Sequence, residues 1–150
     1  MLFRSVVHDQ SNGMYAARAW WLLRYLGHPR VALLSGGLAA WTTAGRTLTT
    51  AAATIVPRVF VAQPDASRVI DVVQLQRELA AGAIRLVDAR GADRYAGQNE
   101  TIDPAAGHVP GAVNHPFARN LDANGQLATV DSLRNLWQTT LAGQIGRAHV

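Results

Sequence analysis

The sequence of 150 residues contains no cysteine and no lysine. Without cysteine the chain can form neither disulfide bonds nor thiolate metal sites. Its fourteen basic residues are all arginines, scattered from Arg4 to Arg147 rather than gathered in the cluster that a nucleic-acid-binding face usually shows. We therefore expect no nucleic-acid partner, despite a net charge of +4.

The sequence also lacks any run of eighteen apolar residues, so it predicts no membrane-spanning helix and no membrane partner. Its first residues, "MLFRS", lack the apolar core of a signal peptide. The length suits about one globular domain. We therefore expect a cytoplasmic protein, and the sequence gives no sign of a cofactor or a metal site.

The pattern of the first part of the chain indicates an α/β unit. An apolar strand at 6–8 is followed by a polar loop, an amphipathic helix at 14–27, a second apolar strand at 31–34 and a short helix within 35–45. The longer helix is predicted from apolar residues spaced by three and four, which are Tyr15, Ala19, Leu22, Leu23 and Leu26. Strands that alternate with helices favour a parallel sheet.

A segment rich in Thr and Ala follows, and we interpret residues 46–66 as a linker that has room for one strand. The α/β pattern then begins again. Its predicted elements are a helix at 69–82, a strand at 84–90, a loop at 91–111 with a helical turn at 93–96, an extended piece at 112–117, and a last helix capped by Thr129 or Asp131.

Two stretches resemble parts of the rhodanese domain. "VDARGADRYAG" with the later "DPAAGHVPGAVNHPF" is similar to the opening signature of that domain, and residues 6–41 resemble its second half. The resemblance implies an α/β fold, a rhodanese-like parallel sheet with flanking helices, present as the second half of one domain and the first half of the next. Residues 6–45 would end an N-terminal, non-catalytic domain, 46–66 would be the linker, and 67–143 would begin the C-terminal, catalytic domain.

The resemblance further implies a piece of a tandem-domain sulfurtransferase of the thiosulfate or 3-mercaptopyruvate type. Such an enzyme moves sulfane sulfur from a small anionic donor to a thiophilic acceptor, cyanide or a thiol, through a cysteine persulfide. This chain lacks the cysteine and should be inactive. The alternative is a catalytically dead rhodanese-homology module with a binding or regulatory role. An unrelated α/β hydrolase with Asp9 as nucleophile would leave the second signature unexplained.

On this resemblance Arg94 matches the arginine that binds the anionic donor, since a guanidinium offers an anion a planar fork of donors. Five residues are expected to support the site structurally: Asp88, Arg90, Gly107, His108 and Gly111. Asp9 stands where an active domain would hold cysteine, and we expect it to cap a helix or hold the loop. Mercaptopyruvate-type members carry a second arginine after the "RY" segment, and the absence of one from "QNETIDP" favours thiosulfate.

Both ends of the sequence look like translated sequencing adapter. The final "IGRAHV", Ile145–Val150, is what ATC GGA AGA GCA CAC GTC encodes, and "MLFRS", Met1–Ser5, matches GTG CTC TTC CGA TCT with GTG as the start codon. We therefore expect these ends to be non-native.

Overall fold

The structure, a computed structural model, describes residues 4–57 and 59–142 and divides into two compact units. Unit 1 comprises Met1–Arg68 with Asn124–Gln126, and unit 2 comprises Val69–Ala123 with Leu127–Val150. Of the two ends predicted to be non-native, residues 1–3 and 145–150 lie outside the described residues.

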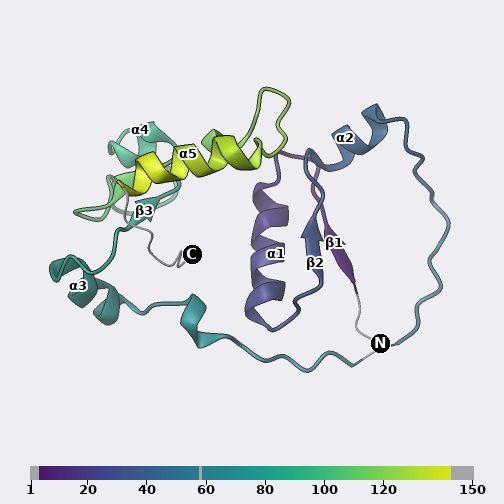
Figure 1. Cartoon of the computed structure of the whole chain (residues 1–150), viewed down its shortest axis with the longest axis horizontal. Coiled ribbons are helices and arrows are strands. Elements are labelled where there is room, and N and C mark those ends of the chain that lie inside the picture. The colour runs from purple at the N-terminus through teal and green to yellow at the C-terminus, as the bar shows by residue number, and fades with distance from the viewer. Residues whose placement is uncertain (1–3, 58, 143–150) are drawn as a thin grey trace. The chain divides into compact units, whose positions relative to one another are not determined.

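Unit 1 is built on a parallel pair of strands joined by a helix. Strand β1 (Ser5–Val7) pairs in parallel with β2 (Val31–Leu33), with Ser5 opposite Val31. The helix between them, α1 (Met14–Tyr25), contacts both strands (Figure 1). The parallel α/β unit predicted for this part of the chain is confirmed.

The apolar face predicted for α1 is only partly buried. Ala16 is the buried residue of this helix, whereas Tyr15 and Leu22, which the spacing placed on the inner face, are exposed. A sheet of two short strands covers too little area to bury a wide apolar stripe, so only the residues nearest the strands lose contact with solvent.

The turn after β2 depends on two glycines. Gly36 and Gly37 both have a positive φ, and helix α2 (Gly37–Thr43) starts at the second of them. A β-carbon on Gly37 would collide with the carbonyl oxygen of Asp9, which also accepts a hydrogen bond from the Leu38 N–H at 3.3 Å. Gly37 therefore permits a close approach of two backbone segments, and Gly36 supplies the left-handed turn that precedes it.

Residues 46–65 contain no helix or strand in their described part and run as an extended segment (Figure 1). Its end is tied to α1, because the N–H groups of Gln63 and Asp65 donate to the carbonyls of Leu26 and Tyr25, both at 2.9 Å. A 3₁₀-helix, η1 (Ala66–Arg68), closes unit 1.

Unit 2 contains a second parallel pair of strands. Strands β3 (Val87–Asp88) and β4 (Val113–Asn114) are hydrogen-bonded in parallel, and the loop between them carries α4 (Ala92–Tyr95). Three further elements complete the unit: helix α3 (Val72–Ala80) before β3, and the 3₁₀-helix η2 (Phe117–Asn120) and helix α5 (Val130–Leu141) after β4.

Helix α3 starts later than predicted. It begins at Val72 rather than at 69, because the Asp71 carboxylate accepts a hydrogen bond from the Gln74 N–H at 2.7 Å and so caps the helix there. Of the two caps predicted for α5, Thr129 is confirmed, since its side chain accepts from the Ser132 N–H.

The most buried large side chain in unit 2 is His115, which is 1% exposed. Its ring stacks on Trp137 of α5 with 4.1 Å between ring centres, and its Nδ1 lies 2.8 Å from the hydroxyl of Thr140. Burial lowers the pKa of His115, because the charged imidazolium loses its hydration. These contacts attach the segment after β4 to α5.

Candidate functional site

The candidate site in unit 2 begins where β3 ends. The Asp88 carboxylate accepts from the backbone N–H of Arg90 at 2.9 Å and from its guanidinium at 2.7 to 3.1 Å. The side chain of Asp88 is 13% exposed, and the Arg90 guanidinium holds the pKa of this carboxyl below its usual value. The strand exit is thus closed by an ion pair between residues two apart.

Arg90 also joins the two ends of the loop that follows. Its Nη2 donates to the carbonyl of Gly107 at 2.6 Å, and its Nη1 donates to Glu100 at 3.4 Å. Gly107 has a φ of +98°, a conformation that favours glycine. Asn114 secures the same corner, since its side-chain amide donates to the carbonyls of Asp88 and Arg90 at 3.1 and 2.9 Å.

Glu100 is the centre of the loop. Its side chain is 4% exposed, and its carboxylate accepts from the backbone N–H groups of Asp103 and Ile102 at 3.0 and 2.9 Å. Together with Arg94, these donors lower the pKa of Glu100 to about 2. A buried, ionised carboxylate therefore stands between two arginines, Arg90 and Arg94.

Arg94 projects from α4 onto Glu100. Its Nε and Nη2 donate to the two carboxylate oxygens of Glu100 at 2.9 to 3.1 Å, and Nη2 also reaches Asp103 at 3.1 Å. Among the residues that the structure describes, none accepts a hydrogen bond from Nη1 of Arg94, and the side chain is 25% exposed. One edge of the guanidinium is thus fixed and the other retains an unused donor.

His108 packs against the same short helix. Its ring stacks on Tyr95 with 3.7 Å between ring centres, and its Nδ1 lies 2.8 Å from the Tyr95 carbonyl. The Tyr95 hydroxyl donates in turn to the carbonyl of Ala112 at 2.7 Å. Gly111, next to Ala112, has a φ of +86°. These contacts link α4 to the segment that enters β4.

In unit 1, Asp9 follows β1 and caps α1. One carboxylate oxygen accepts from the N–H groups of Ser11 and Gly13, and the other from those of Tyr15 and Ala16, at 3.0 to 3.1 Å. These bonds, led by that from Ala16, hold the pKa of Asp9 below its usual value. The carboxylate thus occupies a ring of four backbone donors.

Comparison with known proteins finds similar sequences and a similar fold. The Rhodanese-like domain family matches residues 4–44. The chain is 44% identical over 140 residues to a "Probable 3-mercaptopyruvate sulfurtransferase" of Pseudomonas aeruginosa and 30% identical over 130 residues to the thiosulfate sulfurtransferase of Gallus gallus. A crystal structure of a 3-mercaptopyruvate sulfotransferase from Escherichia coli superposes with a TM-score of 0.77 at 31% identity. The chain has the rhodanese fold and is homologous to these sulfurtransferases.

The matches cover most of this chain but only part of each relative. They span 93% of the chain and 49% of the Pseudomonas sulfurtransferase, 87% and 45% for the Gallus protein, and 91% and 51% for the Escherichia structure. The chain therefore spans about half the length of the sulfurtransferases that it matches.

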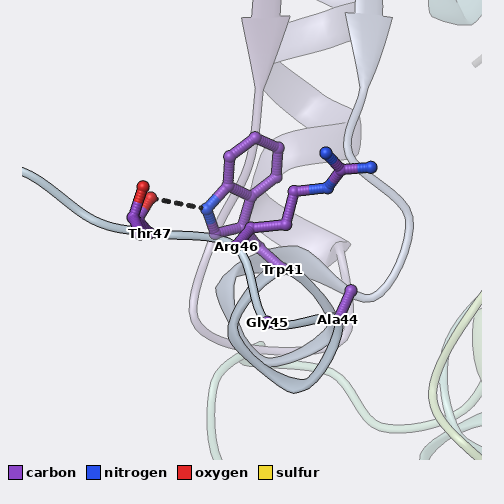
Figure 2. Close-up of a pocket in the computed structure, with 5 residues that line it drawn as sticks. All are labelled: Trp41, Ala44, Gly45, Arg46 and Thr47. Atoms are coloured by element: carbon purple, nitrogen blue, oxygen red, sulfur yellow. Dashed lines mark hydrogen bonds between the residues drawn. The ribbon is translucent and has the colours of Figure 1, made fainter.

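A shallow, open hollow of about 360 Å³ lies elsewhere, in unit 1 at the end of α2. Figure 2 shows its lining, in which the Trp41 indole N–H donates to the carbonyl of Thr47 at 3.1 Å. The Arg46 guanidinium lies 5.6 Å from the centre of the Trp41 ring. The five lining residues include no carboxylate, imidazole or serine hydroxyl, so the hollow offers no acid–base or nucleophilic group of those kinds.

The structure thus brings together four of the six residues singled out in the second unit. Asp88, Arg90 and Gly107 share hydrogen bonds, and Arg94 joins them through Glu100. Sequence reasoning missed Glu100, which links the two arginines. The sequence signal for it was an acidic residue six positions after one arginine and ten after another.

The described residues contain no helix long and apolar enough to cross a membrane.

Proposed function

We propose that this chain is part of a tandem-domain sulfurtransferase that transfers sulfane sulfur from thiosulfate or 3-mercaptopyruvate to cyanide or a thiol. Homology to sulfurtransferases over nearly the whole chain, but over about half of each relative, supports this proposal. In it, residues 6–45 end the non-catalytic domain, 46–66 form the linker and 67–143 begin the catalytic domain.

The reaction needs a cysteine that this sequence does not contain. A thiolate attacks the sulfane sulfur of thiosulfate, the sulfur–sulfur bond breaks with sulfite as leaving group, and the enzyme is left with a persulfide. Cyanide then takes the outer sulfur as thiocyanate and restores the thiolate. Neither step needs a cofactor.

Arg94 carries the contribution of this chain to that chemistry. It follows the carboxyl end of a parallel strand, where α/β folds bind ligands, and Glu100 fixes one edge of its guanidinium. The free Nη1 can then donate a charge-assisted hydrogen bond to an anionic donor without the side chain having to be ordered first. This partly buried, preoriented arginine is the observation on which the proposal depends.

The test uses the full-length protein that carries this sequence. Arg94→Ala should lower kcat/KM for the donor by roughly tenfold to a thousandfold, as expected when a charge-assisted bond at a site is lost. Arg94→Lys should recover only part of the activity, because it loses the planar fork. Arg119→Ala, in η2, is the control and should have little effect. Unchanged kcat/KM in folded Arg94→Ala would show that Arg94 does not anchor the donor.

The second candidate is a rhodanese-homology module that binds ligands without catalysis, and the absence of cysteine from this sequence fits it. Asp9 does not separate the two candidates, because its domain is expected to be non-catalytic in both. The two candidates differ in one codon of the source gene, at the active-site loop of the second domain. Cysteine there supports the enzyme, and any other residue supports the binding module.

A further inference from the structure

The loop that holds Arg94 contains a second carboxylate with a different environment from Glu100. Asp103 lies 3.1 Å from Nη2 of Arg94 and 3.5 Å from Nη1 of Arg90, yet half of its side chain is exposed. Glu100, by contrast, is 4% exposed and accepts two backbone N–H groups in addition to the arginines. Glu100 is therefore built into the loop, whereas the Asp103 carboxylate lies at its surface.

The two carboxylates and their neighbours set the charge that an incoming donor meets. Asp88, Glu100 and Asp103 supply three negative charges against the two positive charges of Arg90 and Arg94. The ion-paired cluster thus carries one net negative charge, and without Asp103 it would be neutral. A guanidinium in such a cluster attracts an anion through its hydrogen bond, while the surplus charge opposes that anion at longer range.

We propose that Asp103 is a specificity-determining residue that biases the Arg94 site against a doubly charged donor and towards a singly charged one. This rests on the proposed function of Arg94. Thiosulfate carries two negative charges and 3-mercaptopyruvate one carboxylate charge at neutral pH. Because the Coulomb energy is proportional to the charge of each partner, Asp103 repels the dianion about twice as strongly as the monoanion.

The geometry sets the size of the effect. A donor bound at Nη1 of Arg94 would lie within roughly 8 Å of the Asp103 carboxylate, which is about one Debye length at physiological salt. At that separation, with half of the carboxylate in water, removal of one charge should change the ratio of kcat/KM for the two donors by about threefold to tenfold. The absence of a second arginine from the loop favours thiosulfate, whereas this acidic residue in the same loop favours the monoanion.

The experiment compares both donors in the full-length protein that carries this sequence. Asp103→Asn should raise the ratio of kcat/KM for thiosulfate to kcat/KM for 3-mercaptopyruvate by about threefold to tenfold, with the gain reduced at high salt. Asp103→Glu retains the charge and should leave the ratio close to the native value. Asp131→Asn, which removes the same charge from an exposed ion pair on α5, should also leave it unchanged.

Each result has a distinct meaning. If Arg94→Ala lowers turnover but Asp103→Asn leaves the ratio within twofold of the native value, or lowers both activities equally, the specificity proposal is wrong while the proposed function stands. If Asp131→Asn changes the ratio as much as Asp103→Asn, the effect comes from net charge and the proposal is also wrong. If neither donor is turned over, or Arg94→Ala has no effect, the proposed function fails and this inference fails with it.

Discussion

Replacement of Asp9 by alanine should destabilise α1 far more than the loss of an ordinary helix cap. The substitution removes the acceptor for four backbone N–H groups at 3.0 to 3.1 Å. Those of Ser11 and Tyr15 are exposed and can bond to water instead, whereas those of Gly13 and Ala16 are partly buried. With two bonds to a charged acceptor counted in full, at about 1.5–3 kcal/mol each, we expect a loss of about 3–6 kcal/mol.

The matched control is Asp71→Ala, which removes a single exposed cap bond at the start of α3. An ordinary cap of this kind contributes about 1 kcal/mol. Native-state amide exchange follows the opening of α1 and of α3 separately in each variant, because α1 lies in unit 1 and α3 in unit 2. We expect the free energy of opening to fall for α1 in Asp9→Ala and, by a smaller amount, for α3 in Asp71→Ala.

The pH dependence provides a second check. Since the pKa of Asp9 is lower in the folded chain, its contribution is fully present above the unfolded value of 3.8 and is lost as the pH falls through the folded value. The difference between the native chain and Asp9→Ala should therefore shrink in acid. Equal losses for Asp9→Ala and Asp71→Ala at neutral pH would refute the view that the four donors act together.

Three further predictions concern the chain as it stands. It should form no thiocyanate from thiosulfate and cyanide, because it has no cysteine, and formation proportional to the amount of pure protein would contradict this. Glu100→Gln should loosen the loop between Arg90 and Asp103. In the native chain, whose Glu100 has a pKa of about 2, amide protection of this loop should fall as the pH drops from 4.5 towards 2, and Glu100→Gln should abolish that pH dependence. Because the pKa of His115 is lowered, amide protection of α5 should be complete above pH 6.5 and decline below it. His115→Asn should remove that decline, and an identical pH profile in the native chain and the variant would show that the ring is not buried in its neutral form.

The sequence predicted the elements whose signals are local. Apolar spacing located α1, and the cap of α5 was narrowed to Thr129 or Asp131, of which the structure shows Thr129. Strand lengths were less predictable, because the mainly apolar residues at 84–87 resemble a strand whether or not a partner strand is present. In the structure β3 is limited to Val87–Asp88, the two residues that face β4.

The cluster of ion pairs among Asp88, Arg90, Arg94, Glu100 and Asp103 was only partly predictable, because part of it depends on contacts between residues distant in sequence. Asp88 and Arg90 are two residues apart, and their pairing follows from the end of a strand. Glu100 and Asp103 lie in a loop without periodicity, where no spacing rule says which way a carboxylate points. Only the fold of the loop shows that one of them is buried between two arginines and the other exposed.

The two units differ in the hydrogen-bond donors that follow their first strand, and this difference affects where an anion can bind. After β1, the Asp9 carboxylate accepts all four N–H groups that gather at the start of α1, so those donors are already used for an anion that belongs to the chain. After β3, Arg94 retains one unused donor beside its ion pairs within the described part of unit 2. An external anion must displace a built-in carboxylate in unit 1 but only approach an open donor in unit 2. This difference supports the proposal that an anionic donor binds in unit 2 rather than in unit 1.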